Sequence, residues 1–486
     1  MRKSISILAL AITLVFTGCE SIVSGLNEDL NNPTDAPAEL MFTGIELAMA
    51  SVHEGYNSLL SSVFSGHYAG RDRQWGDFQV YNLAGVYFDG MWSSSYYGIH
   101  RNARLILEKI EPQGVRVLAG MTKVIMAHNL GTMTALYGDI PYTEASQLET
   151  FPNAKYDSQV AVYAGMQTLL DEAIADLESG VGIPSAGTDI LLGGDPKKWL
   201  EVAYTLKARF YTDTKEYALA ATAAAKGVSS PNNSMYFPHG TTQDQNQNFI
   251  YSFLAVSRIG DVAAESSSGT PAQLLKMIDP ELSSTYRGNE KTDETARFNF
   301  YYLRQGVNVP NRVEPNTVKR ATQVGFMSID AAFPLVTFQE NKLTQAETAL
   351  RVGNFDESLV YLNEYRAYLN NGGYLHPVTA ANFSYKYLAY NAADFENGGM
   401  ENADGISKDD ALLREILEER YVSFYCQTVG WNDERRNRGS MAGVKLTPNA
   451  GTQLPWRFIY SQNEINGNPL APNPVPGVFT IMPIYQ

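Results

Sequence analysis

The chain of 486 residues contains only two cysteines, Cys19 and Cys426, so no disulfide framework within the chain holds the fold together. Charged side chains make up only 18% of the residues, and 37 basic residues stand against 52 acidic ones. Because phosphate binding needs a basic surface, the formal net charge of −15 argues against nucleic acid as a partner. Hydrophobic residues reach the 44% expected of a globular protein, which excludes disorder as the main state.

The motifs of common hydrolases and nucleotide-binding enzymes are also missing. The sequence has no HExxH zinc motif, no GxSxG nucleophile elbow and no Walker phosphate loop. His128 lies on an apolar helical stripe, where a core histidine is the better interpretation than a metal ligand. Adjacent carboxylates such as Asp409 and Asp410 do not identify a glycosidase site, because 52 acidic residues make some pair inevitable. We therefore expect no enzyme, no cofactor and no metal.

The first residues predict export and lipid anchoring. Arg2 and Lys3 precede an apolar stretch over 5–16, which is too short to span a membrane but typical of a secretory signal. Cys19 follows Gly18 directly, as in a bacterial lipobox, although Phe16 stands where leucine is usual. We expect a signal peptide over 1–18, acyl chains on Cys19 and a tether over 19–37. The alternative is an ordinary signal peptide with a chance cysteine.

Helical periodicity predicts a mainly α fold built from helix pairs, with large irregular loops and little β structure. The apolar stripes lie within 121–135, 163–177, 199–211 with 215–226, 343–351 with 355–369, and 408–427. Asp157 or Ser158 is the candidate N-cap of the second stripe, and Gly353-Asn354 turns between the paired helices. These helix–turn–helix units resemble tetratricopeptide repeats without a constant period. The segments 65–100, 228–330 and 428–486 show no helical period and are interpreted as binding loops on a single domain over 38–486.

Aromatic residues are concentrated in one segment. Residues 68–97 hold nine aromatic side chains, where the chain average of 11% predicts about three. Sugars present apolar C–H faces ringed by hydroxyls, which suit a flat ring with planar polar groups at its rim. The candidate ligand contacts are therefore Arg73, Trp75, Tyr81 and Tyr87. A weaker second candidate runs from Phe298 through Phe300 and Tyr301 to Tyr302 and Arg304. The alternative is that most of these rings are core, above all Trp92, Tyr96 and Tyr97.

Short motifs spread over most of the chain carry a resemblance to a known family. They are Leu136-Tyr137-Gly138-Asp139-Ile140-Pro141-Tyr142 with Thr143-Glu144-Ala145, Gly194-Asp195, Lys198-Trp199, Leu206-Lys207-Ala208-Arg209, and Trp431-Asn432-Asp433 with Arg435-Arg436. Together with the lipobox, they resemble the SusD/RagB family, the surface glycan-binding lipoproteins of Bacteroidetes nutrient uptake. One departure is Asp279-Pro280-Glu281, where many members have Asp-Pro-Arg, so the pairing of that arginine is expected to be rearranged.

The resemblance implies a non-catalytic lipoprotein on the outer face of the outer membrane. Such a protein binds an oligosaccharide or polysaccharide and delivers it to a SusC-like TonB-dependent transporter. The shared motifs around Tyr137 and Trp431 are expected to be structural, through turns and buried arginine–carboxylate pairs. Two alternatives stay open from the sequence: the same architecture binding peptides, and a secreted glycoside hydrolase.

Overall fold

The computed structural model describes residues 36–307 and 312–486. The expected signal peptide over 1–18, the lipid-bearing Cys19 and the tether up to residue 35 lie outside the described residues. Within the described ranges, no helix is both long and apolar enough to span a membrane.

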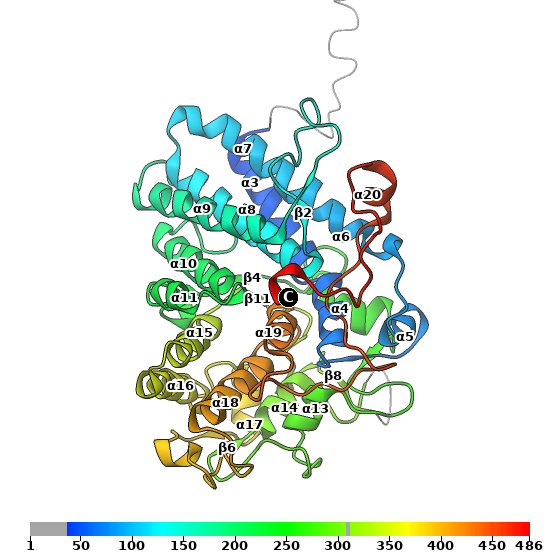
Figure 1. Ribbon diagram of the computed structural model, residues 1–486, viewed down its shortest axis with the longest axis vertical. Coiled ribbons are helices and arrows are strands. Elements are labelled where there is room, and N and C mark those ends of the chain that lie inside the picture. The colour runs from blue at the N-terminus through cyan, green and yellow to red at the C-terminus, as the bar shows by residue number, and fades with distance from the viewer. Residues whose placement is uncertain (1–35, 308–311) are drawn as a thin grey trace, which may run out of the picture.

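Helix pairs form the scaffold of the molecule, in agreement with the expected tetratricopeptide-like fold. Figure 1 shows α9, α10, α11, α15 and α16 stacked one below another along one side, with α8 and α18 behind them on the inner side. Their bounds are α8 (Arg116–Tyr137), α9 (Gln159–Glu178), α10 (Pro196–Asp213), α11 (Tyr217–Ala224), α15 (Phe338–Arg351), α16 (Phe355–Asn370) and α18 (Lys408–Ser423). The stack gives the chain a long rigid edge against which its irregular segments pack.

Local sequence explains where these helices begin and turn. The Ser158 side chain accepts a hydrogen bond from the amide of Ala161 at 3.3 Å, so it is the N-cap of α9 that the sequence predicts. Gly353 has a φ of +87° between α15 and α16, a conformation that costs glycine little and other residues more. The helical stripes of the sequence are thus confirmed, with their turns.

The remaining helices are shorter and pack beside the stack. They are α3 (Ala38–His53), α4 (Tyr56–Phe64), α5 (Arg73–Gln79), α6 (Asp89–Ser93), α7 (Asn102–Ile110), α12 (Phe249–Tyr251), α13 (Gln273–Ile278), α14 (Thr295–Tyr301), α17 (Pro377–Asn382), α19 (Thr428–Asn437) and α20 (Gln462–Gly467). The π helices are η2 (Ser94–Arg101) and η5 (Ser252–Ser257), and the short 3₁₀ helices are η1 (Gly85–Phe88), η3 (Glu111–Gln113), η4 (Pro231–Asn233), η6 (Ala392–Phe395) and η7 (Pro483–Tyr485).

The described strands are all short and pair in twos, antiparallel, which fits the expectation of little β structure. The pairs are β1 (Ala69–Gly70) with β5 (Val262–Ala263), β2 (Ile140–Pro141) with β3 (Tyr156–Asp157), β4 (Met235–Phe237) with β11 (Phe333–Val336), β6 (Thr292–Asp293) with β12 (Lys386–Tyr387), β7 (Tyr302–Leu303) with β8 (Glu314–Pro315), and β9 (Lys319–Arg320) with β10 (Gln323–Val324). They join segments that are distant in sequence rather than forming a sheet core.

All three segments that lack apolar periodicity contain helices, contrary to the sequence prediction, and 228–330 contributes α12, α13 and α14. The segment 65–100 contains α5, α6 and η2, and α18 ends at Ser423 before a new helix, α19, begins at Thr428. Cys426 lies in the turn between them, fully buried and with a φ of +56°, which confirms it as a core residue. The period of α19 is hidden because its buried positions include Asp433, Glu434 and Arg436 rather than apolar residues.

Buried ion pairs tie α19 to the scaffold. Arg436 donates to both carboxylate oxygens of Glu347 on α15, at 2.5 and 2.8 Å, and also contacts Asp433 at 2.7 Å. Arg420 on α18 donates to the same Asp433 at 2.7 Å. Removing one partner of such a pair leaves the other charge buried and uncompensated, which costs roughly 3–5 kcal/mol. The Trp431 motif is therefore structural, as expected.

A second buried network surrounds the histidine expected in the core. His128 is 2% exposed, stacks on His53 at 3.9 Å and lies 3.0 Å from the Arg209 guanidinium. Arg209 in turn donates to both oxygens of Glu340, at 2.5 and 2.6 Å. His128 is thus a core residue, and the arginine of the Leu206–Arg209 motif joins α10 to α15.

A buried acid pair fastens the connection between α9 and α10 to α3. Glu46 on α3 is fully buried and accepts from the amide of Ile190 at 3.0 Å. Burial and the hydrogen bond to Asp189 raise the pKa of Glu46 to about 10, so Glu46 is protonated at neutral pH. Asp189 accepts from the Trp199 indole at 2.7 Å and from the amides of Leu192 and Gly194. Glu46 thus joins the α9–α10 connection to α3, and Asp189 joins it to Trp199 on α10.

Candidate functional site

The structure buries three of the six candidate contacts in the core. Trp75 is 0% exposed, with its ring 5.1 Å from Tyr56 and 5.2 Å from Phe253. The Tyr302 hydroxyl donates to the carbonyl of His67 at 2.6 Å, and Tyr81 is 7% exposed. Since a buried ring cannot stack on a ligand, the prediction of these three as stacking contacts is corrected. The aromatic enrichment of 68–97 therefore reflects packing of the core rather than ligand binding, because large rings cluster in cores.

The other three candidates reach the surface but do not converge on one cavity. Tyr87 is 37% exposed, Arg73 donates to Asp261 at 2.5 Å, and Arg304 donates to Asp279 at 2.6 Å and contacts Glu281 at 2.8 Å. Both arginines are therefore already paired. Asp279-Pro280-Glu281, where many members of the family have Asp-Pro-Arg, is paired with Arg304, which contacts both of its carboxylates. As ligand contacts, these three residues stay predictions.

The aromatic segment does border a polar hollow of about 270 Å³ between α5 and α13. Its walls are formed largely by hydroxyl and amide groups, from Gln79, Ser266, Ser267, Ser268, Thr270, Gln273 and Asn449 among others. Several of these hydroxyls already bond one another, as Ser266 and Ser268 do at 2.9 Å. The hollow has few exposed rings, so it offers hydrogen bonds without a stacking platform.

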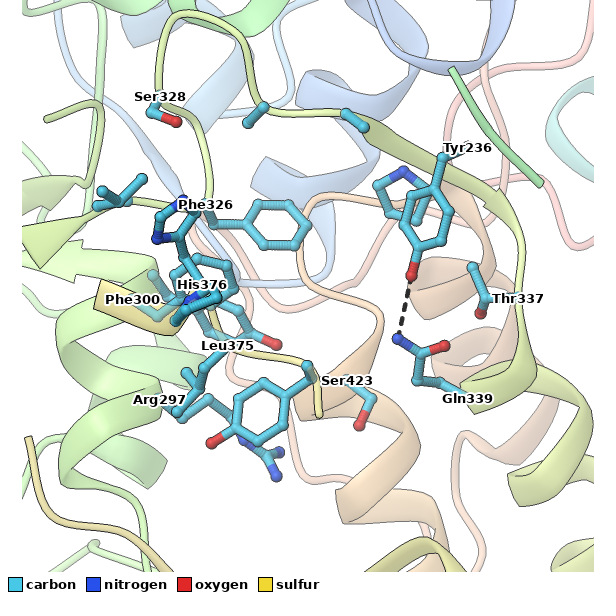
Figure 2. A pocket seen from close by; sticks show the side chains of 18 of the residues that line it. Tyr236, Arg297, Phe300, Phe326, Ser328, Thr337, Gln339, Leu375, His376 and Ser423 are labelled. Carbon is cyan, nitrogen blue, oxygen red and sulfur yellow. Dashed lines mark hydrogen bonds between the residues drawn. The ribbon is translucent and has the colours of Figure 1, made fainter. Parts of the chain in front are cut away.

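A larger cavity of about 400 Å³ lies between α14, the segment 319–339 and the ends of α16, α17 and α18. Figure 2 shows its two walls, with Tyr236, Thr337 and Gln339 on one side and Phe300, Phe326, Leu375, His376 and Arg297 on the other. The volume falls within the roughly 300–1,000 Å³ of typical ligand sites. We call this space the aromatic cavity.

Rings from two segments make a continuous wall of the aromatic cavity. Phe300 and Tyr301 end α14, and each lies 5.4 Å from the Phe326 ring in an edge-to-face arrangement. Tyr301 also stacks on Tyr425 at 4.2 Å, which fixes its orientation. Phe326 is only partly buried, so it presents ring surface to the cavity. A rigid ring in this position suits the C–H face of a sugar.

Polar groups stand opposite and below these rings. The Gln339 amide donates to the Tyr236 hydroxyl at 3.2 Å, as Figure 2 shows, and the Tyr365 and Ser423 hydroxyls bond at 2.7 Å. At the base, Arg297 is fully buried and donates to Glu419 at 2.8 Å while its Nε lies 3.1 Å from Glu294. The cavity thus combines an apolar wall with hydrogen-bonding groups whose positions are fixed.

Neighbouring charges and burial determine the protonation states of the ionisable groups in and around the cavity at neutral pH. Burial opposes ionisation, but Arg297 and Arg287 lower the pKa of Glu419 to about 2, so it stays a carboxylate. Burial and then Lys319 lower the pKa of His376, which is therefore neutral at pH 7. Lys319 itself forms an ion pair with Asp330 at the cavity mouth.

In the described part of the chain, three charged side chains line the aromatic cavity, those of Arg297, Lys319 and Asp330. Of the described residues that line the cavity, only Asp330 carries a carboxylate, whereas glycoside hydrolysis uses two facing ones. Across the described ranges, no cluster of histidine, cysteine or acidic residues is placed to hold a metal ion. The groups at hand can hold a polar ligand that has apolar faces.

Sequence reasoning found only part of the aromatic cavity. Phe300 and Tyr301 belong to the weaker second candidate segment, and both line the cavity. Tyr236, Phe326, Tyr374 and Gln339 were missed because they lie outside the two aromatic segments, 68–97 and 298–304, that the sequence singled out. Their only signal is that two of them fall in the long non-periodic stretch 228–330.

Solved structures with a similar fold come from several bacteria. A SusD homologue from Bacteroides fragilis has a TM-score of 0.66 at 17% identity, with 92% of this chain and 100% of that chain covered. A SusD/RagB family protein from Bacteroides thetaiotaomicron gives 0.65 at 18% identity, over 90% and 95%. A chitin-binding SusD homologue from Flavobacterium johnsoniae gives 0.59 at 19% identity, over 88% and 92%. At these identities the likeness shows the fold alone.

Curated protein sequences include no significant match to the chain. A family model does match, over residues 30–461, and its description is "Starch-binding associating with outer membrane". The matched range includes every helix of the scaffold and the whole aromatic cavity. The chain therefore belongs to the SusD-like family.

Proposed function

We propose that the protein is a non-catalytic surface lipoprotein that binds oligosaccharide or polysaccharide in the aromatic cavity and delivers it to a SusC-like TonB-dependent transporter. The observation that carries the proposal is the cavity itself, in which the partly exposed Phe326 ring, packed on the buried rings of Phe300 and Tyr301, faces fixed polar groups within a SusD-like fold. Rings of this kind bury the C–H faces of a sugar, and amide and hydroxyl groups bond its rim.

The family description and the first residues of the sequence support the proposed location on the outer membrane. The family description names outer-membrane association and starch binding, and one neighbour in fold is described as chitin-binding. On this proposal acyl chains on Cys19 hold the protein to the outer membrane, facing the cell exterior. The ligand then passes to the transporter without any bond being broken.

The test is a panel of neutral and acidic polysaccharides in affinity-gel electrophoresis, followed by calorimetry with oligosaccharides of whichever glycan retards the protein. Phe326→Ala removes the exposed ring of the cavity and is expected to weaken binding about tenfold or more. Phe249→Ala is the matched control, because that ring is 44% exposed and lies outside the cavity. Equal affinities of both variants and the parent would place the binding site elsewhere.

Three outcomes would overturn the proposal itself. Retention of no polysaccharide at all would remove its basis, and calorimetric binding of peptide mixtures but not of glycans would favour the peptide alternative. Release of reducing ends by the purified protein would show a hydrolase. Partnership with the transporter predicts co-purification of the two proteins from solubilised outer membranes, and separation of the two in mild detergent would count against it.

A further inference from the structure

His376 lies in the wall of the aromatic cavity, immediately before the short helix α17. The side chain is half-buried and lines the cavity on the same side as Phe326, as Figure 2 shows. Because a residue before proline is held in extended backbone, Pro377 favours the φ of −63° and ψ of 136° that His376 adopts. An N-cap residue needs this backbone conformation, and His376 is the N-cap of α17.

The cap determines which ring nitrogen of His376 carries the hydrogen. Nδ1 accepts a hydrogen bond from the amide of Val378 at 3.2 Å, so Nδ1 itself carries no hydrogen. A neutral imidazole has a single N–H group, and its place is set by the bond that the other nitrogen makes. The hydrogen therefore lies on Nε2. A ring turned over would place a C–H group against the Val378 amide and lose the cap.

The imidazole of His376 is neutral at pH 7. Burial and then Lys319 on β9 lower its pKa, and Asp330, the other charged group that acts on it, opposes this shift. Lys319 and Asp330 form an ion pair with each other at the cavity mouth. Protonation would put a hydrogen on Nδ1 and break the bond to Val378, so the capping ring is the neutral one.

The Nε2–H group of His376 is left for a ligand. Within the described residues it has no hydrogen-bond partner, yet it is accessible, in contrast to the unpaired and buried Nε2 atoms of His53 and His67. Its helix is also held in place, because the Thr379 hydroxyl donates to the carbonyl of Val324 at 2.7 Å and accepts from the Val324 amide at 3.0 Å. A donor in a fixed position loses little freedom when it binds.

We infer that His376 is a specificity residue of the aromatic cavity, whose Nε2–H group, fixed by the α17 cap, donates a hydrogen bond to an oxygen atom of the bound sugar. The inference rests on the proposed function, because it names a ligand contact of that same site. Phe326 on the same wall presents ring surface to the C–H groups of a sugar. His376 adds a requirement for a hydrogen-bond acceptor, which ring surface alone does not impose.

Asparagine and glutamine at position 376 separate the roles of the two ring nitrogens. The Asn side chain places an acceptor where Nδ1 lies and caps α17, but it ends short of the place of Nε2. The Gln side chain brings an amide donor to the place of Nε2, but it is a poor N-cap. His376→Asn should therefore keep the unfolding midpoint and bind about threefold to tenfold more weakly, whereas His376→Gln should lower the midpoint and keep its affinity within about twofold.

The probes are maltoheptaose and chitohexaose, because the family description names starch and one structure of similar fold is described as chitin-binding. Both are titrated calorimetrically into the purified parent and the two variants. Nitrogen-15 NMR of histidine-labelled protein reads the tautomer, with the His376 signals assigned by their loss in His376→Gln. The parent should show the Nε2–H tautomer at pH 7, and its Nε2 resonance should shift when the probe that binds is added.

An Nδ1–H tautomer of His376 would overturn the inference while leaving glycan binding intact. So would an Asn variant that binds as tightly as the parent, or an equal loss of affinity in both variants, since the latter would show that His376 acts only through the cap. Binding of neither probe, nor of any glycan in the affinity-gel panel, by a parent that has the Nε2–H tautomer would overturn the proposed function and the ligand contact with it. The two failures are therefore distinguishable.

Discussion

Glu46→Gln tests the buried acid pair that fastens the α9–α10 connection to α3. Glu46 is fully buried, and its pKa rises from an ordinary 4.5 to about 10 through burial and the hydrogen bond to Asp189. A raised pKa contributes stability that is fully present below pH 4.5 and is lost as the pH rises towards 10. Between pH 4.5 and pH 7, an interval of 2.5 pH units, the folded protein loses about 3 kcal/mol of this stability.

Glutamine keeps the shape and the donor towards Asp189 but cannot ionise in the unfolded chain. The variant should therefore match the parent near pH 4.5 and exceed it by about 3 kcal/mol at pH 7, with a larger difference at pH 9. Urea unfolding followed by circular dichroism at pH 5, 7 and 9 measures the difference. A variant that is less stable than the parent by the same amount at every pH would show that Glu46 is ionised in the folded protein.

Glu347→Gln is the matched control, because the same substitution is made at a buried carboxylate that stays ionised. Although burial opposes it, Arg436 and Arg420 lower the pKa of Glu347 to about 2. Removing this charge leaves Arg436 and Arg420 with Asp433 as their one shared carboxylate, so we expect a loss of about 3–5 kcal/mol at pH 7. If both substitutions change the free energy of unfolding in the same direction at pH 7, the protonation states assigned to these two acids are wrong.

Three further outcomes follow from the same structure. Trp75→Ala should lose about 3–5 kcal/mol of unfolding free energy while the folded fraction keeps its glycan affinity, because the ring is core; a selective loss of affinity in calorimetry would contradict this. The stability of the parent should fall as the pH drops from 4.5 towards 2, because Glu347 and Glu419 both have pKa values lowered to about 2. Acid titration followed by circular dichroism measures this loss, and a stability that does not change over this range would refute the pairing. A ligand concentration of one hundred times Kd should add about 2.7 kcal/mol to the stability of the parent, as read by thermal unfolding. Tenfold weaker binding by Phe326→Ala should remove about half of that gain at the same ligand concentration, and an equal shift in both proteins would exclude the ring from the site.

The helical scaffold could be predicted from sequence because its helices bury apolar stripes. The stripe over 163–177 and the cap at Ser158 sufficed to place α9, and Gly353 marked the turn between α15 and α16. The helix α19 could not be found in this way, since its buried face carries Asp433 and Arg436, whose partner Glu347 lies far away in the sequence. Periodicity detects helices that bury hydrocarbon, and it misses those that bury ion pairs.

The site was harder to predict than the fold for a related reason. The high density of aromatic residues at 68–97 drew attention to Trp75. In the structure, however, that ring packs against Tyr56 and Phe253 and is not exposed to solvent. The exposed ring of the cavity, Phe326, has no aromatic neighbour within five positions of the chain. Its partners Phe300 and Tyr301 reach it only through the folded loop, so no window of sequence contains the site.

The aromatic cavity is built from segments that are distant in sequence, so its shape depends on the tertiary contacts between them. Its walls run from Tyr236 on β4 through α14 and the segment 319–339 to Gln427 beyond α18, so no short fragment of the chain contains them all. A bound sugar therefore acts as a non-covalent staple across nearly two hundred positions of chain, and its release should loosen segments on both sides together. Amide exchange in α14 and in the last turn of α18 should slow in step when ligand binds, although the two segments are joined only through tertiary contacts.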